Sequence, residues 1–200
     1  MCHDFFNDSS FYHFLFQIDQ DIASDVQSRC CQYCGGNLHS ACYPRKPRGP
    51  GHCLTKDYGT RLSFCCARED CRRRTTPPSV RFLGRKVYLG VVIVLITAFN
   101  HGLSHQRQQQ LFDQLDLYPQ TFYRWLKWWR KVFPASRCWQ SSRGRFMPPV
   151  ETHQLPGALL GRFTGRDLPH RLCQFLQLLL PLSTTSWSGY LRIAIDPQKM

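Results

Sequence analysis

Two groups of closely spaced cysteines are the residues of this sequence whose types and spacing best suit metal chemistry. The segment CCQYCGG places two residues between Cys31 and Cys34 and follows them with glycine. In such a knuckle the chain turns tightly enough for both sulfurs to face one ion, and nearby amides can point at the thiolates. This pair therefore predicts one half of a metal site.

The second half of the site is predicted in RLSFCCAREDCRRR. On an extended strand Leu62, Phe64 and Cys66 share one face, so Cys66 with Cys71 is the preferred second pair. Cys65 points the other way and is the alternative third ligand. Four thiolates fill a tetrahedral zinc site and leave no position for water, so the pattern predicts one structural zinc ion and no catalytic metal.

Spacing leaves two alternatives to this four-cysteine site open. The second pair has four residues between its cysteines, and 31 residues separate Cys34 from Cys66, which exceeds the usual ribbon separation. The cysteines could instead be reduced structural thiols without a metal. A mixed site could also recruit residues of the long insert, namely His39, Cys42, His52 or Cys53.

A second motif, TFYRWLKWWRK at residues 121–131, combines three tryptophans with four cations. On a helix at about 100° per residue, its large apolar side chains fall within one stripe about 100° wide, which suits a core-facing surface. These side chains are Phe122, Trp125, Leu126 and Trp129. The polar side chains that fall almost opposite are Gln120, Arg124, Lys127 and Lys131. The aromatic side chains are thus expected to pack into the core while the cations face outward.

This cationic face suits a DNA recognition helix, because Arg can pair with guanine, Gln with adenine and Lys with phosphate. We expect Gln120, Arg124, Lys127 and Lys131 to contact DNA. The alternative is the last helix of a bundle with a solvated cationic face.

The elements around this motif predict a helix-turn-helix at residues 84–133. A first helix is expected over residues 85–100 and a second behind Ser104, a suitable N-cap. The second helix is expected to bury Leu111, Phe112 and Leu115. A tight turn at residues 117–118 follows, and Pro119 suits the first position of the third helix.

The rest of the chain supplies the other expected elements. Residues 1–29 predict an N-terminal helical arm, with apolar residues at steps of three and four and acids opposite. These apolar residues are Phe11, Phe14, Leu15, Ile18, Ile22 and Val26. Residues 30–80 predict a zinc-ribbon-like module with short strands, and residues 134–200 a C-terminal segment with one helix near residues 169–180. The expected fold class is α+β, mostly α.

Composition and charge limit the classes of function. The chain has 26 Lys and Arg against 13 Asp and Glu, a net charge of +13, which points to a polyanion. Nucleic acid is favoured over an anionic membrane, because the arginines cluster around Pro, Gly and aromatic residues instead of along one helix face. The 11 cysteines and an acidic start without an apolar core indicate a reducing cytoplasm.

The most apolar run, residues 87–99, is shorter than the ~20 residues of a bilayer span and is expected to form a buried helix. We therefore expect no membrane segment.

The expected phosphate contacts lie in the basic middle of the chain, where twelve cations stand against three acids between residues 45 and 86. Arg72, Arg73 and Arg74 are the expected phosphate-binding residues. The twelve are Arg45, Lys46, Arg48, Lys56, Arg61, Arg68, Arg72, Arg73, Arg74, Arg81, Arg85 and Lys86.

The order CQYCGG, YPRKPRG, FCCAREDCRRRTTPPSVRFLGRKVYLG and TFYRWLKWW resembles bacterial mobile-element proteins that join a zinc ribbon to a helix-turn-helix. Such modules stand at the N-terminus of insertion-element transposases or form small accessory proteins. The resemblance covers roughly residues 28–133 and is most specific at the Cys knuckles and the RRRTTP turn. It implies binding to element DNA, with Cys31, Cys34, Cys66 and Cys71 at the ribbon positions.

The sequence departs from those transposases in its carboxylates, because their catalysis needs three spaced acids that hold two metal ions. After residue 120 it offers only Glu151, Asp167 and Asp196. We therefore predict a non-catalytic, zinc-dependent DNA-binding protein serving transposition or repressing its own element. The expected partners are double-stranded DNA, a separate catalytic transposase or integrase subunit, and a second copy of the chain in a homodimer.

The alternative functions are an RNA-binding or protein-assembly zinc module and a nuclease. The nuclease reading rests on His101 and His105 in FNHGLSHQ.

Overall fold

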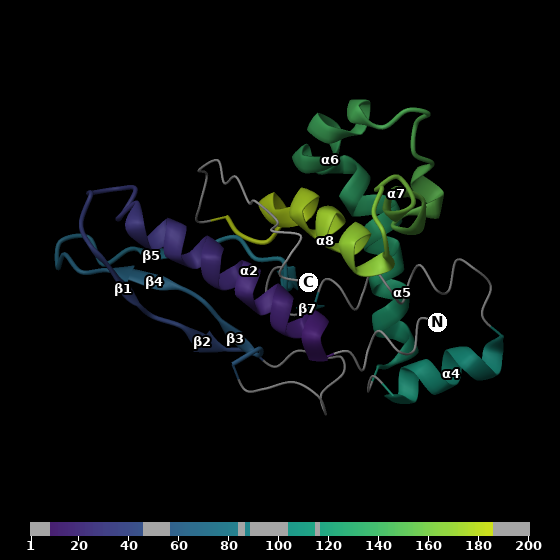
Figure 1. Cartoon of the computed structure of the whole chain (residues 1–200), viewed down its shortest axis with the longest axis horizontal. Coiled ribbons are helices and arrows are strands. Elements are labelled where there is room, and N and C mark those ends of the chain that lie inside the picture. The colour runs from purple at the N-terminus through teal and green to yellow at the C-terminus, as the bar shows by residue number, and fades with distance from the viewer. Residues whose placement is uncertain (1–8, 46–56, 84–86, 89–103, 115–116, 186–200) are drawn as a thin grey trace.

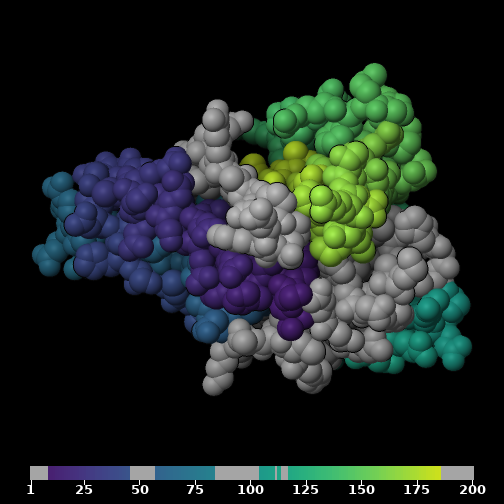
Figure 2. All heavy atoms as spheres, in the orientation of Figure 1, coloured from purple at the N-terminus to yellow at the C-terminus, as the bar shows by residue number. Residues whose placement is uncertain are grey.

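The computed structural model describes residues 9–45, 57–83, 87–88, 104–114 and 117–185. The protein is α+β and mostly α, as predicted from the sequence. Helix α2 (Ser9–Ser28) runs between a small group of strands and a larger helical part (Figure 1). In the space-filling view the Cys-rich strands form one end of the molecule (Figure 2).

The apolar face of α2 is buried as its periodicity predicted, and all six apolar residues named above lie in the core. The first turns of α2 pack into the large hydrophobic core, while Ala23 and Val26 pack into a second, smaller core under the cysteines. The helix therefore belongs to both cores. The prediction that its acids lie opposite fails at Asp19, which is only 1% exposed.

The strands are short and antiparallel. Strands β1 (Leu38–Ser40), β4 (Phe64–Cys66) and β5 (Arg74–Thr75) form one sheet in the order β1-β4-β5. Strand β2 (Tyr43–Pro44) pairs with β3 (Thr60–Arg61). In the three-stranded sheet His39 lies opposite Cys65, and Cys65 lies opposite Arg74.

The helix predicted over residues 85–100 is contradicted at its start. Val87–Tyr88 forms strand β7, which pairs with β6 (Phe82–Leu83). The β-branched and aromatic side chains of this stretch favour an extended backbone when a partner strand is available. The remainder of the predicted helix lies outside the described residues.

The second and third predicted helices are present as α4 (His105–Gln114) and α5 (Pro119–Lys127). The Ser104 hydroxyl accepts from the N–H of Arg107 at 3.4 Å, and Pro119 occupies the first turn of α5. The Phe112 and Phe122 rings pack 5.6 Å apart between the two helices. The side chains of Leu111 and Leu115 lie outside the described part.

Helix α5 continues as a π-helical segment (Trp128–Val132) and a 3-10 turn (Phe133–Ala135). Pro134 has no N–H to donate to a carbonyl of the preceding turn, which accounts for the loss of α-helical bonding here. The wider turn still directs Trp129 and Phe133 into the core, where their ring centroids lie 4.9 Å apart.

The C-terminal segment contains more helices than the single one predicted. Helix α8 (Leu168–Leu179) matches that prediction, with Asp167 as its N-cap. The additional elements are the shorter helices α6 (Arg137–Ser142) and α7 (Gly157–Leu160) and the 3-10 turns Arg143–Arg145, Thr152–Gln154 and Leu180–Leu182. These elements are too short to show a helical period. The ring centroids of Trp129 and of Phe175 in α8 lie 5.8 Å apart, so the C-terminal segment shares one core with the helix that continues α5.

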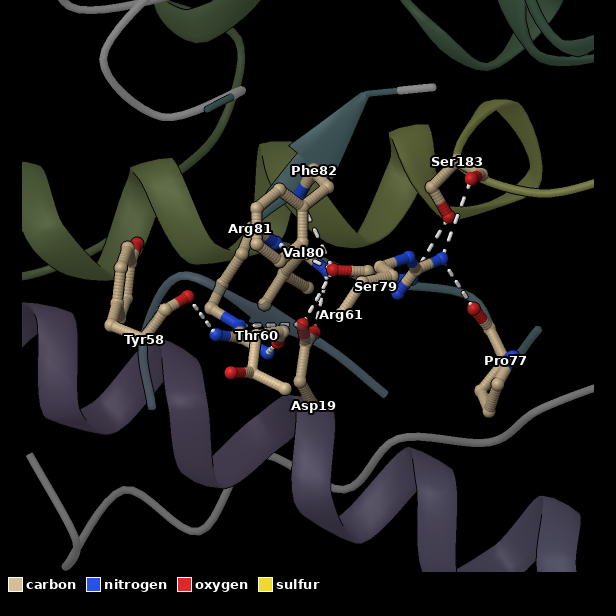
Figure 3. A network of polar contacts seen from close by, with 10 residues as sticks. All are labelled: Asp19, Tyr58, Thr60, Arg61, Pro77, Ser79, Val80, Arg81, Phe82 and Ser183. Atoms are coloured by element: carbon tan, nitrogen blue, oxygen red, sulfur yellow. Dashed lines mark hydrogen bonds and ion pairs between the residues drawn. The ribbon is translucent and has the colours of Figure 1, made fainter. Parts of the chain in front are cut away.

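A buried polar network joins α2, the Cys-rich module and the C-terminal part (Figure 3). The Asp19 carboxylate accepts from Arg81 Nε at 2.7 Å, from the Val80 N–H at 2.8 Å and from the Ser79 hydroxyl. Arg81 also donates to the carbonyls of Tyr58 and Thr60. This ion pair is buried, so its geometry and its extra hydrogen bonds must offset the cost of removing both charges from water.

Arg61 extends this network toward the C-terminal part. Its Nη2 donates to the carbonyls of Pro77 at 2.6 Å and Ser183 at 3.5 Å, and Ser183 Oγ accepts from the Ser79 N–H at 2.8 Å. Burial lowers the pKa of Arg61, and the negative charge of Asp19 acts in the opposite direction. Two of the twelve cations expected on a basic surface, Arg61 and Arg81, are thus core residues.

Within the described part of the chain, no helix has both the length and the apolar character needed to cross a bilayer.

Candidate metal centre

The four cysteines predicted as ligands come together from two turns and one strand end. Cys31 and Cys34 lie in the turn that follows α2, Cys66 ends β4, and Cys71 lies in the turn before β5. Their four sulfur atoms all lie within 4.8 Å of one another. The Cys31 and Cys71 sulfurs are 3.8 Å apart, and the Cys34 and Cys66 sulfurs are 3.4 Å apart.

These separations fit four ligands around a single ion. A tetrahedral site with zinc–sulfur bonds of about 2.3 Å has sulfur–sulfur edges of about 3.8 Å. The preferred pair Cys66 and Cys71 is therefore the one that the fold brings to Cys31 and Cys34. Cys65 faces away, and its sulfur lies 3.4 Å from the carbonyl of Arg72.

The mixed-site alternative receives no support from the residues that the structure describes. Cys42 is exposed, with its sulfur 3.3 Å from the Ser40 hydroxyl, and His39 is exposed on β1 outside the cluster. His52 and Cys53 fall outside the described residues.

Backbone conformation shapes the first knuckle. The N–H of Cys31 donates to the Gly36 carbonyl and the N–H of Gly35 donates to the Cys31 carbonyl, both at 2.8 Å. Gly35 has φ +68°, a left-handed conformation that favours glycine. A Cβ on Gly36 would lie 3.2 Å from the Cys66 sulfur and 2.8 Å from Arg68 Cγ, so this glycine lets the two knuckles approach closely.

Backbone amides point at all four sulfurs. Burial acts to raise the pKa of Cys31, but donation from the N–H groups of Tyr33 and Cys34 brings this pKa down to about 7. Amides two residues further along reach the other sulfurs in the same way. The donors are Gly36 for Cys34, Arg68 for Cys66 and Arg73 for Cys71.

The remaining three thiols show why such a cluster suits a cation. For Cys34 the Gly36 amide lowers the pKa, yet burial and the neighbouring Cys66 thiol oppose it, and the net shift is upward. The pKa values of Cys66 and Cys71 are also raised despite their amide donors. A divalent ion at the centre would stabilise all four thiolates at once.

The cysteines also form part of the small core beneath them. Leu38 and Phe64 of the sheet pack there with Ala23 and Val26 of α2, and Cys31 and Cys66 are buried beside them. This core is small for a loop-rich module, which fits the prediction that a structural zinc ion stabilises it.

The exposed arginines around this centre differ in their partners. Arg68 lies 3.3 Å from Asp70, and Arg72 lies 3.7 Å from Glu69. Arg73 stacks over the Tyr33 ring at 4.2 Å, and Arg74 lies 5.3 Å from the centroid of Tyr43. Sequence analysis missed the two tyrosines, although each stands within the Cys-rich module.

The second predicted site, the outer face of α5 and of the π-helical segment that continues it, is exposed as expected. Gln120, Arg124, Lys127 and Lys131 all face solvent, and Arg124 donates to the Thr121 hydroxyl at 3.1 Å. On the inner side Phe122 and Trp129 are buried, while Trp125 and Leu126 are partly buried against the large core. Figure 1 places this helix and the three-stranded sheet toward opposite ends of the molecule's long axis.

No protein-family model matches this chain, and comparisons with curated proteins and with solved structures likewise found no match.

Proposed function

We propose that this chain is a zinc-stabilised, non-catalytic DNA-binding protein, with the Cys-rich module as its zinc ribbon and α4–α5 as part of a helix-turn-helix. The observation that carries the proposal is the cluster of four cysteine sulfurs within 4.8 Å of one another, set among exposed arginines. The resemblance to transposase-associated modules adds that the DNA belongs to a mobile element.

Zinc is the proposed metal because the ligand set consists of four thiolates. Soft sulfur ligands in a tetrahedral arrangement select zinc or iron–sulfur chemistry, and a single ion fits this sulfur spacing. With four protein ligands the ion is structural. In zinc-finger peptides such an ion contributes on the order of 10–16 kcal/mol of apparent binding energy to folding.

Duplex DNA is the proposed partner because of charge and of what the exposed cations can contact. The net charge of +13 supplies long-range attraction to a polyanion. The face of α5 offers Gln120 and Arg124 for base edges and Lys127 and Lys131 for phosphate.

The non-catalytic assignment rests on the acids of the C-terminal half. Asp167 accepts from the His170 N–H at 2.9 Å as the cap of α8, and Glu151 is exposed, 3.8 Å from His153. Asp196 lies outside the described residues. For the nuclease alternative, His105 stands exposed at the start of α4, and His101 also lies outside them.

Two adjacent cysteines provide a matched test of the metal centre. We expect purified wild-type protein and Cys65→Ser to contain one zinc ion per chain by elemental analysis, and Cys66→Ser to lose it. Because the two variants differ by one position and by no charge, general damage to the strand affects both. Zinc retained by Cys66→Ser and lost by Cys65→Ser would reverse the assignment, and a folded metal-free wild type would overturn it.

The same proteins test the partner. We expect wild-type protein and Cys65→Ser to bind duplex DNA with an affinity that falls steeply with salt, and Cys66→Ser to bind weakly because its module is disordered. Competition with duplex RNA of equal length separates the RNA-binding alternative, and preference for RNA would favour it. A catalytic transposase gene beside this one would support the mobile-element assignment.

A further inference from the structure

The outer face of the three-stranded sheet carries a row of polar side chains above the metal centre. Leu38 and Cys66, which lie opposite each other on β1 and β4, are buried. Adjacent residues on a strand point to opposite faces, so the register places His39, Cys65 and Arg74 together on the outer face. This outer face is therefore accessible to a ligand while the inner face holds the cysteines.

Two tyrosines at this end of the module order arginine side chains. The guanidinium carbon of Arg73 lies 4.2 Å from the Tyr33 ring centroid. The Tyr43 ring contacts two guanidiniums, with Arg45 at 4.6 Å and Arg74 at 5.3 Å, and Arg74 also donates to the Ala41 carbonyl at 3.5 Å. Stacking of this kind holds a guanidinium in place without cancelling its charge.

The four arginines near Cys66 and Cys71 thus fall into two pairs. Arg68 and Arg72 each have a carboxylate beside them, Asp70 and Glu69, which lowers the positive potential at those two positions. Arg73 and Arg74 have no carboxylate partner among the described residues. Both are exposed.

We propose that Arg73 and Arg74, positioned by Tyr33 and Tyr43, supply the phosphate contacts of the Cys-rich module to duplex DNA, and that Arg68 and Arg72 do not. This inference rests on the proposed function and assigns its backbone contacts to particular residues. Arginines already ordered on a ring lose less conformational freedom when they bind a phosphate. Two neighbouring cations without an acid beside them are also complementary to the closely spaced phosphates of a duplex.

The stacked geometry favours the nucleic-acid backbone over bases. Proteins that bind single strands without sequence preference stack bases on aromatic faces. Here guanidiniums already lie over the Tyr33 and Tyr43 rings. The two arginines would therefore position the duplex independently of sequence and leave base recognition to another element.

Two double variants with equal charge changes test this assignment. Arg73→Gln with Arg74→Gln, and Arg68→Gln with Arg72→Gln, each remove two positive charges from the same module and keep most of each side chain. Each phosphate contact contributes about −0.9 to the slope of log affinity against log salt. We expect the first pair to flatten the slope by about 1.8, which corresponds to up to about a 30-fold loss of affinity at ~0.15 M salt. The second pair should leave the slope near that of the wild type.

A variant without a charge change tests the role of the tyrosine. Tyr33 is 53% exposed, so Tyr33→Leu should not disturb folding. Loss of an exposed cation–π contact should weaken duplex binding by about two- to fivefold, with an unchanged salt slope. Zinc content and circular dichroism confirm that each variant is folded.

The outcomes separate this inference from the proposed function. Equal slopes for the two double variants would overturn the assignment while leaving DNA binding intact. A wild-type chain that does not bind duplex DNA would overturn both. If Tyr33→Leu weakens single-stranded DNA binding much more than duplex binding, the Tyr33 ring stacks bases and the backbone assignment is wrong.

Discussion

Adjacent cysteines of one strand have opposite roles in this molecule. Cys66 points inward to the cluster, while Cys65 points outward toward the carbonyl of Arg72. The two residues are chemically identical, so only the alternation of side chains along β4 distinguishes them. The reactivity of each thiol therefore depends on the position of its residue in the fold, and cysteine labelling can measure it.

Thiol labelling should separate three classes of cysteine. Burial, with the negative charge of Asp167 acting in the same direction, raises the pKa of Cys173 to about 12. Its thiol thus stays protonated at pH 8 and should not react with iodoacetamide in the folded protein, whereas exposed Cys42 should react rapidly. Peptide mass spectrometry measures both.

The metal ligands form the third class. We expect Cys31 and Cys34 to resist labelling in the zinc-loaded protein and to become reactive after chelation, while Cys173 remains unlabelled. After zinc is removed, Cys31 should react readily with iodoacetamide, because hydrogen bonds from backbone amides hold its pKa at about 7 despite burial. If Cys173 reacts as fast as Cys42 in the folded protein, its buried position is wrong. If chelation leaves Cys31 unreactive, the metal assignment is wrong.

Helix α5 shows how one element meets two demands. Phe122 and Trp125 pack toward the core, and the cations remain on the opposite, exposed face. The π-helical segment that follows extends this arrangement to Trp129, which is fully buried. The sequence pattern predicted the exposed face, and its role in DNA recognition stays a prediction.

Replacement of Arg124 tests that role. We expect Arg124→Ala to cost about 1–3 kcal/mol on the preferred DNA site and much less on random duplex, because a base contact is lost. Lys131→Ala should weaken both about equally. Affinities for the two DNAs at one salt concentration supply the comparison. An unchanged ratio for Arg124→Ala would favour the bundle-helix alternative.

The inner face of α5 supplies the folding control. Phe122→Ala should destabilise the protein by about 3–5 kcal/mol, because its ring is fully buried. Trp125→Ala should cost less, since Trp125 is only partly buried. Urea unfolding gives both values, and Arg124→Ala should unfold like the wild type.

At the scale of the whole molecule, α2 and the Asp19 network join two cores that the sequence places far apart. Arg81 and Arg61 come from the middle of the chain, and Ser183 comes from near the end of the described residues. Because Asp19 is the one acid that the described residues contribute to this network, two buried cations depend on its charge.

Removal of this acid should therefore be costly. We expect Asp19→Ala to destabilise the protein by about 3–5 kcal/mol, because it leaves buried cations without a compensating charge. Asp21→Ala, two residues along the same helix and exposed, should change stability by less than about 0.5 kcal/mol. Urea unfolding of zinc-loaded protein measures both, and equal effects would contradict the structural role of Asp19.

Patterns within single elements were predictable from the sequence. Helical spacing identified the buried face of α2 and the inner face of α5, and residue type identified the cap Ser104 and the first-turn proline Pro119. Strand alternation chose Cys66 over Cys65, so all four clustered cysteines were named in advance. Such features depend on neighbours three or four positions away, which the sequence displays directly.

Only the tertiary structure decided the features whose partners lie far along the chain. Asp19 follows Leu15 by four residues and precedes Ile22 by three, so it lies on the apolar face of its helix. This spacing was a signal that its side chain is buried. Its partner Arg81 nevertheless looked like one more surface cation. The same limit applies to Arg72, Arg73 and Arg74. These neighbours look alike in the sequence, and only the fold brings a carboxylate beside Arg72 and a tyrosine ring beside each of the other two.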